Sequence, residues 1–379
     1  MEKVRFGIIG TGGMGQGHLQ MQASIEEAQL TAICDIDAEL RERLAAQYEV
    51  PAFATHTELL ESGLVDAVII ATPHYFHPPI AIEAMRKGIH VLSEKPIAVT
   101  VKAADAMIAT ARETGVQFGV MFQMRSQKEY RLARKAIDEG IIGEIYRTSL
   151  TMGWYRSQAY YDSATWRATW AGEGGGVLLN QAPHNLDLFT WLAGMPAKVT
   201  AQVRTRLHDI EVEDEAFALL EYPNGAHGYL YCSVNEAPGV SRMEICGDRG
   251  KIVVDEHGLR ISRCVPPVRV FTVNSTEMWK APASEPVELE VPEMPASHAT
   301  ITRAFARAIL YGEPLLAPGE EGIRELELSN AIILSGKRGK TVELPLDRDE
   351  YEELLAELVA TSRAKERVVA QRVTDPNVK

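Results

Sequence analysis

Two basic side chains in this sequence stand where they could move a proton, Lys95 and His184. The segment Glu94-Lys95-Pro96 directly follows an expected strand at residues 90–93, so Pro96 restricts the backbone of Lys95 and Glu94 can orient its ammonium. A free lysine has a pKa of about 10.4, which falls in a dry site or beside another cation. The sequence therefore predicts a lysine that accepts or donates a proton, with a surface lysine at a strand end as the alternative.

His184 follows Pro183 at the expected first turn of a helix, after a glycine-rich segment. Its ordinary pKa of about 6.5 makes it a natural general base, and the alternative is a histidine satisfied within the core. Asn180 lies four residues before it and Asp187 three residues after it, so either side chain could orient the ring. Because Pro183 disfavours a helix before it, Asn180 could instead reach the ring from a loop. We expect Lys95 and His184 to be the catalytic residues.

A second pair of histidines, His74 and His77, follows Ala71-Thr72-Pro73 at the end of an expected strand, residues 67–70. The H-x-x-H spacing resembles a metal-binding pair, but the sequence offers no third ligand, so we predict no metal. In doubly wound sheets, ligands bind at the carboxyl ends of the strands. We therefore expect both histidines to line a cofactor cleft.

The densest aromatic region of the chain extends from residue 154 to residue 170. Two interpretations have equal support: core filling, or a platform for the apolar face of a sugar ring or nicotinamide. On the second interpretation, phenols and a guanidinium bind hydroxyl groups. The expected substrate-binding residues are then Tyr155, Trp166, Arg167, Asn180 and Gln181, together with Lys95 and His184.

These residues need a scaffold, and the first thirty-five residues have the pattern of a dinucleotide-binding βαβ unit. The apolar run Val4–Ile9 suits a buried parallel strand, and G-x-G-x-x-G follows it directly and opens a helix. Glycines at these positions permit a tight turn, close approach of a pyrophosphate, and packing of helix on strand, while free N–H groups face the phosphate. The residues of this motif are Gly10, Thr11, Gly12, Gly13, Met14 and Gly15.

Asp35 ends the second expected strand, twenty residues after the last glycine of the motif. A carboxylate at this place can accept both ribose hydroxyls of an adenosine. It also repels a 2′-phosphate, and no arginine adjoins it in the sequence. We therefore predict NAD as the cofactor, with NADP less favoured.

The order of expected elements divides the chain in two. Six strands alternate with helices up to residue 121, and β-rich sequence then dominates, including the hairpin signal Asn224-Gly225 and an expected strand at residues 268–273. We predict an α/β fold, with an N-terminal Rossmann doubly wound parallel sheet in residues 1–123. Residues 124–379 are predicted to form an α+β domain with an open-faced, mostly antiparallel sheet, used for substrate binding and oligomerisation.

Composition excludes several other classes of protein. The net charge of −13, from 39 basic and 52 acidic residues without a basic tract, argues against nucleic acids and anionic membranes as partners. No apolar run reaches transmembrane length, and the first expected strand leaves no room for a signal peptide. The four cysteines form no C-x-x-C pair, which favours a reducing cytoplasm over disulfides or zinc. We expect a cytoplasmic protein.

With these motifs, the sequence resembles the glucose–fructose oxidoreductase / inositol dehydrogenase (Gfo/Idh/MocA) family over nearly its whole length. The resemblance rests on the glycine motif, Asp35, Ala71-Thr72-Pro73, Glu94-Lys95-Pro96 and the glycine-rich segment before His184, and Glu-Lys-Pro is its most specific part. It implies that Lys95 and His184 flank the substrate carbon whose hydride goes to the nicotinamide.

The resemblance also assigns further residues and an assembly. It implies that Thr72, Pro73, Glu94, Lys95 and Gln123 contact the cofactor, and that the C-terminal sheet mediates a homodimer or homotetramer. One departure concerns Asn180, because polyol and inositol dehydrogenases of this family often have an aspartate four residues before the histidine. An asparagine can hydrogen-bond a hydroxyl but cannot take its proton. Relatives with Asn-Gln here resemble sugar or glycoside oxidoreductases.

Three functions follow as hypotheses. The leading one is an NAD-dependent dehydrogenase that acts on a secondary alcohol of a sugar, glycoside or cyclitol, with either Lys95 or His184 as the base. The second retains and recycles NAD, so that transient oxidation at C3 of a glycoside permits elimination of the aglycone, as in a glycosidase. The third is a non-catalytic, nucleotide-dependent sensor, since a fold alone does not determine function.

Overall fold

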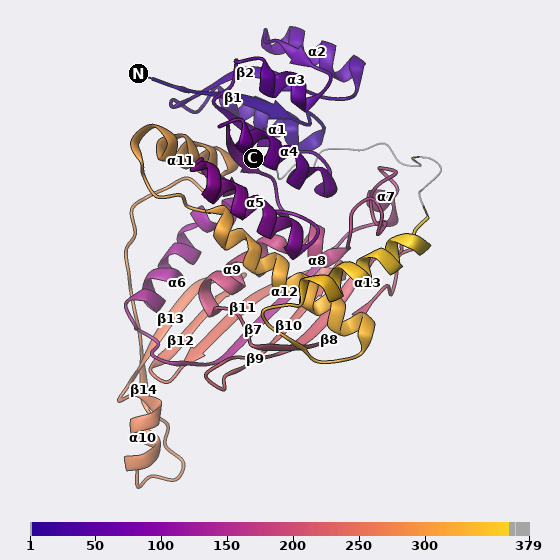
Figure 1. Ribbon diagram of the computed structural model, residues 1–379. Coiled ribbons are helices and arrows are strands. Elements are labelled where there is room, and N and C mark those ends of the chain that lie inside the picture. Colours follow the sequence, from indigo (N-terminus) through magenta and orange to yellow (C-terminus); the bar gives the residue numbers. More distant parts are fainter. Residues whose placement is uncertain (1, 364–367, 369–379) are drawn as a thin grey trace.

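The N-terminal part of the chain is a six-stranded parallel sheet, in a computed structural model that describes residues 2–363 and 368 (Figure 1). Its strand order is β3-β2-β1-β4-β5-β6, which is the predicted doubly wound Rossmann arrangement. The strands are β1 (Val4–Ile9), β2 (Ala28–Cys34), β3 (Ala52–Phe53), β4 (Ala67–Ile70), β5 (His90–Ser93) and β6 (Phe118–Val120). The helices are α1 (Gly13–Gln22), α2 (Ala38–Tyr48), α3 (His56–Glu61), α4 (His77–Arg86) and α5 (Val101–Thr114), with short 3-10 turns η1 (His74–Phe76) and η2 (Gln123–Ser126).

The strand order reverses between β1 and β4, and the carboxyl ends of these strands lead into the predicted cofactor residues. The glycine motif follows β1, Thr72 and Pro73 follow β4, and Glu94 and Lys95 follow β5. All four residues of β4 are buried, as expected for a strand that helices cover on both faces. Ligands of such sheets bind at this reversal point, so the fold brings these loops to one edge.

The C-terminal part contains a nine-stranded sheet with the order β14-β13-β12-β11-β7-β10-β9-β8-β15. Only β7 and β10 pair in parallel, and the other neighbours are antiparallel, so the predicted, mostly antiparallel sheet is confirmed. The strands are β7 (Ile145–Tyr155), β8 (Lys198–Arg204), β9 (Glu215–Glu221), β10 (His227–Ser233), β11 (Asn235–Gly247), β12 (Gly250–Asp255), β13 (Gly258–Val265), β14 (Ala283–Pro286) and β15 (Val342–Glu343).

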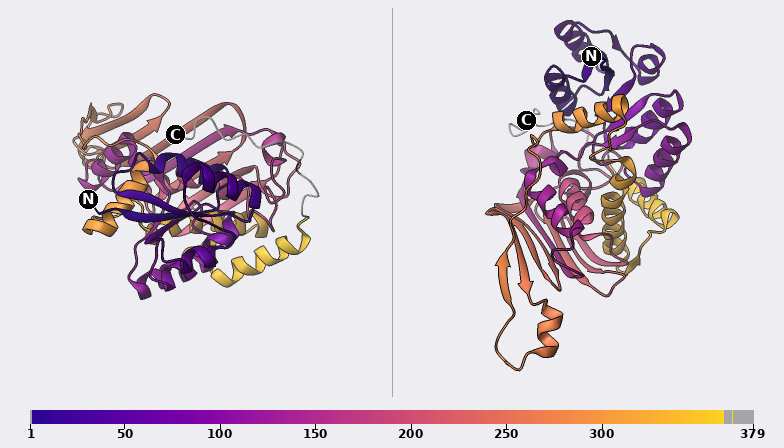
Figure 2. Two further views of the ribbon diagram at one scale, coloured as in Figure 1. Left: turned by 90° about the horizontal axis from the view of Figure 1, so that it is seen from above. Right: turned by 90° about the vertical axis from the view of Figure 1, so that its left-hand side faces the viewer.

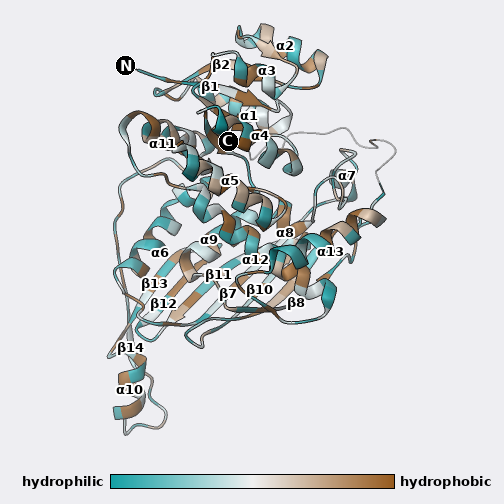
Figure 3. Cartoon of the chain, in the orientation of Figure 1, coloured by the Kyte–Doolittle hydropathy of each residue, from teal (hydrophilic) through white to brown (hydrophobic). Residues whose placement is uncertain are grey.

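Helices cover one face of this sheet and leave the other face open (Figure 2). Hydrophobic and hydrophilic residues interleave along its strands (Figure 3), and in β9 buried residues alternate with the exposed Phe217 and Leu219. Tyr229 of β10 is exposed on the neighbouring strand. The helices of this part are α6 (Lys128–Asp138), α7 (Gln158–Tyr161), α8 (Val177–Asn180), α9 (Pro183–Ala193), α10 (Val268–Asn274), α11 (His298–Tyr311), α12 (Gly319–Arg338) and α13 (Arg348–Thr361).

The expected strand at residues 268–273 is wrong, because this segment is helix α10 at the end of a projecting arm (Figure 1). Its alternation of valine with other residues predicts a strand, but a strand needs a partner, and β13 pairs with β14 instead. Pro267 stands directly before the helix, and Thr272 Oγ1 donates to the carbonyl of Val268 one turn back, at 2.8 Å. No residue of α10 is buried.

Helix α11 returns from the C-terminal part to pack on the N-terminal sheet. Ile301 and Phe305 of α11 lie in one buried cluster with Val4, Phe6 and Ile8 of β1. The predicted domain boundary at residue 123 therefore stays a prediction, because the hydrophobic core around the N-terminal sheet contains residues from both sides of this boundary. The last residues of the predicted second domain lie outside the described range.

Candidate active site

The glycine motif forms a close contact between α1 and the turn after β1. Gly12 precedes α1, and Gly13, Met14 and Gly15 form its first turn. A Cβ atom on Gly15 would lie 2.0 Å from the carbonyl oxygen of Gly10, so no other residue fits there without a shift of the backbone. This is the close packing of helix on strand that the motif predicts, and it leaves backbone N–H groups at the helix start for a phosphate.

Asp35 lies beside this motif and is bound to it. One carboxylate oxygen accepts hydrogen bonds from the Thr11 backbone N–H at 2.6 Å and from Thr11 Oγ1 at 2.9 Å. The sequence places no arginine next to Asp35, but α2 brings Arg41 to it, and Arg41 donates to the Asp35 carbonyl at 2.8 Å. A cation is therefore bound to the backbone of Asp35, and the Asp35 carboxylate is the group that would repel a 2′-phosphate.

Substitution of Asp35 by serine is expected to raise the use of NADP relative to NAD by about 10- to 100-fold in kcat/KM. The variant loses the acceptor for the ribose hydroxyls and the charge that repels a 2′-phosphate, while Arg41 remains. Initial rates with each cofactor measure the ratio. Asp37→Ser is the matched control, because the Asp37 side chain caps α2 through the Leu40 N–H, while only its backbone N–H contacts Asp35. An unchanged ratio in Asp35→Ser would contradict the assigned role.

His77 lies between two loops at the carboxyl edge of the sheet. Its Nδ1 lies 2.9 Å from the carbonyl oxygen of Pro96, and its Nε2 lies 2.8 Å from that of Thr72. His74 instead contacts the carbonyl oxygen of Glu173, at 3.0 Å from Nδ1. Among the described residues, no group of three or more potential ligands is arranged to hold a metal ion. The two histidines thus contact backbone of the loops around the expected cofactor position.

Glu94 does not orient the ammonium of Lys95, contrary to expectation. Its carboxylate contacts Nε2 of the buried His18 at 2.7 Å. From Lys95 it accepts a hydrogen bond of the backbone N–H, at 3.2 Å, and not of the ammonium. Burial alone would raise the pKa of the Glu94 carboxyl, but the hydrogen bond and charge of His18 outweigh burial and lower it to about 2. His18 lies on α1, and nothing in the sequence links it to Glu94.

Lys95 crosses from the N-terminal sheet to the C-terminal part of the chain. Its Nζ donates a hydrogen bond of 2.8 Å to the backbone carbonyl of Asn180, at the end of α8. Burial lowers the pKa of Lys95, and the nearby carboxylate of Glu94 partly offsets this effect. The Lys95–Pro96 peptide bond is cis. A lysine with a lowered pKa can supply a neutral amine as a proton acceptor.

His184 occupies the first turn of α9, as predicted, but neither expected partner orients its ring. Asp187 instead forms a buried ion pair with Arg125, at 2.6 Å. The Gln123 carboxamide contacts His184 instead, and its Nε2 lies 3.2 Å from Nε2 of the ring. Burial, followed by the charge of Lys95, lowers the pKa of His184 to about 3. The imidazole is therefore neutral near pH 7, and its Nδ1 has no partner among the described residues.

Asn180 belongs to a polar cluster that includes two residues absent from the predicted set, Tyr160 and Glu173. Asn180 Nδ2 donates to the Glu173 carboxylate, and Asn180 Oδ1 accepts from the Tyr160 hydroxyl at 3.2 Å. Arg167 Nη1 donates to the same hydroxyl at 2.5 Å, and Gln181 Nε2 lies 3.3 Å from it. One feature of the sequence could have indicated Glu173: it is an isolated acidic residue within the glycine-rich segment that leads to His184.

The predicted aromatic residues divide between this cluster and the surface. The Trp166 ring lies 6.1 Å from the His74 ring, centre to centre, and 4.7 Å from the guanidinium carbon of Arg167. Tyr155, at the end of β7, is exposed and makes no hydrogen bond or ring contact with Lys95 or His184. Its role in substrate binding stays a prediction, as do the roles of the other substrate-binding residues.

An observation independent of the glycine motif also supports an NAD cofactor at the carboxyl edge of the N-terminal sheet. Four of the predicted site residues each have one buried polar atom that lacks a partner among the described residues. They are Thr72 Oγ1, Gln123 Oε1, Gln181 Oε1 and His184 Nδ1. Buried polar groups are normally hydrogen-bonded, so these atoms leave hydrogen bonds that a polar ligand such as NAD would complete.

The start of α8, which leads to Asn180, is held by a buried glutamate, Glu213. Its Oε1 accepts from the backbone N–H groups of Gly176 at 2.9 Å and Leu178 at 3.1 Å, and its own carbonyl accepts from Val177 at 2.8 Å. A Cβ atom on Gly176 would lie 1.8 Å from that carbonyl oxygen, so the approach requires glycine. Burial raises the pKa of Glu213 from 4.5 to about 7, against the opposing effect of these hydrogen bonds.

This raised pKa predicts that stability falls as pH rises. The unfolded chain releases the Glu213 proton near pH 4.5, while the folded chain keeps it to about pH 7. Between these values the folded state binds more protons, so about 3 kcal/mol of unfolding free energy is lost by pH 8. Glu213→Gln is expected to remove this loss, and urea unfolding at pH 5 and pH 8 measures it. Glu213→Ala, which removes the acceptor, should be less stable at both pH values.

Comparison with known proteins identifies both parts of the chain. Residues 4–122 match the oxidoreductase family with an NAD-binding Rossmann fold, and residues 130–253 match the Gfo/Idh/MocA C-terminal domain. The chain is 28% identical to the 2,7-anhydro-N-acetylneuraminate hydratase of Mediterraneibacter gnavus, over 67% of this chain and 71% of that protein. It is 25% identical to the myo-inositol 2-dehydrogenase of Thermotoga maritima, over 90% of this chain and 98% of that protein.

A solved structure gives a similar result. The WlbA dehydrogenase from Bordetella pertussis, in complex with NADH and UDP-GlcNAcA, superimposes with a TM-score of 0.77 and 30% identity. The match covers 91% of this chain and all of that chain. In the described part of the chain, no helix has the length and apolar composition needed to cross a bilayer.

Proposed function

The chain belongs to the Gfo/Idh/MocA family of NAD-binding oxidoreductases that act on sugars or cyclitols, and on this premise we propose that it oxidises a secondary alcohol of a sugar, glycoside or cyclitol. One observation carries this proposal. Lys95, from the carboxyl end of β5, donates to the carbonyl of Asn180, which leads into the helix of His184. The charge of Lys95 also acts on His184, which supports a shared role for the two residues at the edge of the sheet where the nicotinamide is expected.

The proposed roles of the two residues follow from their pKa shifts. NAD, when bound, supplies a nicotinamide that accepts a hydride. Lys95 takes the hydroxyl proton, because burial lowers its pKa toward the working pH, where a general base is most effective. His184 is too weak a base for this step, since its pKa is about 3. As a neutral imidazole, it holds and orients the hydroxyl by a hydrogen bond.

Absorbance at 340 nm tests the proposal directly. Purified protein with NAD and a panel of sugars, glycosides and inositols should form NADH with one class of compound. Binding of NAD without NADH formation on any compound would contradict a simple dehydrogenase.

A second candidate function has its own support. The hydratase of Mediterraneibacter gnavus is among the relatives of the chain, which supports a recycled cofactor with elimination from a transiently oxidised sugar as the second candidate. In that case NAD should co-purify tightly with the protein, and product should form from a glycoside with no net change at 340 nm.

We also propose that the chain assembles through the open face of the C-terminal sheet. Phe217, Leu219 and Tyr229 lie on adjacent strands and are 41–54% exposed. Large side chains of this kind, gathered on one face, are typical of an interface between subunits. Light scattering should give a dimer or tetramer, and Leu219→Glu should lower the molar mass of the assembly.

We also propose that the protein works in a reducing cytoplasm, which its four free cysteines support.

A further inference from the structure

One guanidinium beside Asn180 has unused donors although it is nearly completely buried. Arg167 is 4% exposed. Its Nη1 donates to the Tyr160 hydroxyl and lies 3.5 Å from Oε1 of Glu173. Its Nε is buried without a partner, and no described residue accepts a hydrogen bond from its Nη2. The Nε–Nη2 edge of the guanidinium therefore has no hydrogen-bond partner among the described residues.

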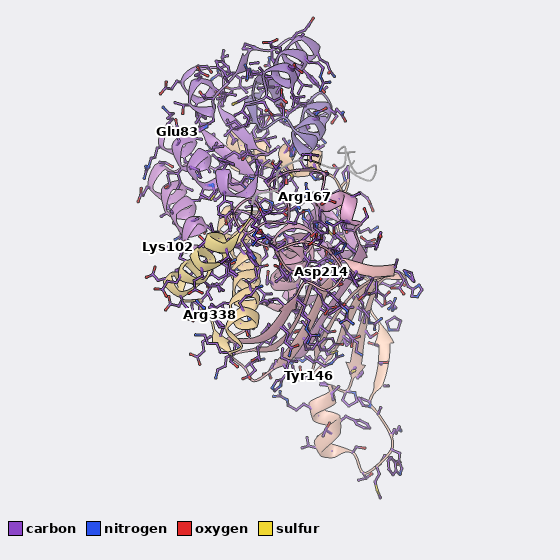
Figure 4. All side chains as sticks on the ribbon, turned by 90° about the vertical axis from the view of Figure 1, so that its right-hand side faces the viewer. Glu83, Lys102, Tyr146, Arg167, Asp214 and Arg338 are labelled. Atoms are coloured by element: carbon purple, nitrogen blue, oxygen red, sulfur yellow. The ribbon has the colours of Figure 1, made fainter. Side chains whose placement is uncertain are left out.

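Two aromatic rings fix the plane of this guanidinium. The guanidinium carbon lies 4.4 Å from the centroid of the Tyr160 ring and 4.7 Å from that of the Trp166 ring. Figure 4 shows Arg167 between the N-terminal domain and the C-terminal sheet. Its charge acts on Lys95, and it shares the Tyr160 hydroxyl with Asn180. An arginine that is already oriented loses little conformational freedom when it binds a ligand.

The charge of Arg167 is incompletely matched. The only carboxylate that pairs with it among the described residues is Glu173, at 3.5 Å, and Lys95 adds a second cation nearby. Glu173 also accepts from the Asn180 amide and the Ala168 N–H, and burial raises its pKa. Buried charges in proteins are normally paired and hydrogen-bonded, and Glu173 is the one ion-pair partner of Arg167 in the described part of the chain, so the guanidinium can take a further anionic partner.

We propose that the substrate is an acidic sugar whose carboxylate binds the Nε–Nη2 edge of Arg167. This inference rests on the proposed function and names its substrate class. The two parallel N–H donors of this edge match the two oxygens of a carboxylate, whereas a sugar hydroxyl could use only one of them well. Arg167 is then the residue that selects acidic over neutral sugars, while Lys95 and His184 act on the alcohol.

The experiment compares sugars that differ only in this charge. Isothermal titration of the NADH-loaded enzyme would use D-glucuronate and D-galacturonate, each against its methyl ester, together with glucose 6-phosphate. The acids should bind about 10- to 100-fold more tightly than their esters, as expected for a charged, bidentate hydrogen bond. Arg167→Lys keeps the charge but lacks the fork, and should remove most of this difference.

Arg156→Lys is the matched control, because Arg156 also lies against the Tyr160 ring, 5.5 Å from its centroid, but donates to the Tyr155 carbonyl. It should keep the preference for acids. The acid–ester comparison in the unaltered enzyme remains valid even if Arg167→Lys folds poorly, which thermal unfolding and NADH affinity would reveal.

Each other outcome has a definite meaning. Equal binding of acid and ester, or a preference that survives in Arg167→Lys, would overturn the proposal. Tighter binding of glucose 6-phosphate than of either acid would overturn it in favour of a phosphate ligand. If NADH binds but none of the sugars does, the proposed sugar oxidoreductase itself is contradicted, and the inference falls with it.

Discussion

Replacement of Lys95 by alanine is expected to lower kcat for alcohol oxidation by about 10²- to 10⁴-fold, while NAD still binds. The physical reason is that Lys95 supplies the base, and its Nζ donates a hydrogen bond to the Asn180 carbonyl. The Glu94 carboxylate is held by His18 and cannot replace it. Steady-state rates at saturating NAD measure kcat, and titration of NAD followed by protein fluorescence measures the affinity for the cofactor.

Two further variants distinguish the base from a merely structural lysine. Lys95→Arg keeps the positive charge but cannot deprotonate, so it should be nearly as slow as the alanine variant. A small primary amine added to Lys95→Ala should restore part of the rate. Lys87→Ala is the matched control, because Lys87 pairs with Glu61 near the amino end of β5 and should not affect the rate. Near-normal turnover in Lys95→Ala would contradict the role.

The pH dependence of kcat has a sign that follows from the same assignment. Only the neutral amine of Lys95 accepts a proton, so the rate should fall as pH falls through the lowered pKa of Lys95. This acid limb should lie below the ordinary lysine value of about 10.4 and should be absent from Lys95→Arg.

Much of the N-terminal fold could be predicted because its signals are local. An apolar strand, a glycine motif and a terminal acid follow one another between Val4 and Asp35, and the structure joins them as predicted. The second half is harder, because its strands take their identity from distant partners. The segment at 268–273 alternates like a strand but forms α10, since no neighbouring strand pairs with it.

In the candidate site, too, local sequence predicts single residues but not the distant residues that contact them. Lys95 and His184 could be identified from their own neighbours in sequence, but their partners could not. A spacing of three or four residues suggests Asp187 as a partner for His184, yet Asp187 pairs with Arg125, 62 residues away. Likewise, the distant His18 takes the carboxylate of Glu94. Tertiary contacts of this kind leave no mark on local spacing, which is why the sequence predicts the reactive groups better than the groups that hold them.

Replacement of His184 by glutamine is expected to lower kcat/KM by about 10- to 100-fold without removing the acid limb of the pH profile. The imidazole has a pKa of about 3, so it stays neutral from pH 5 to pH 9 and contributes a hydrogen bond rather than a titrating base. Glutamine offers polar atoms at a similar reach but cannot reproduce the position of the ring beside Gln123. The loss should therefore be smaller than that in Lys95→Ala.

The pH profile decides between the two possible bases. If His184 is the base, the acid limb disappears in His184→Gln and survives in Lys95→Ala, which is the reverse of the expected result. His56→Gln serves as control, because His56 pairs with Glu83 on α4, far in sequence from the site, and should leave both rate and profile unchanged. The double variant Lys95→Ala/His184→Gln should be little slower than Lys95→Ala, because a hydrogen bond that orients the hydroxyl adds little once its proton acceptor is gone.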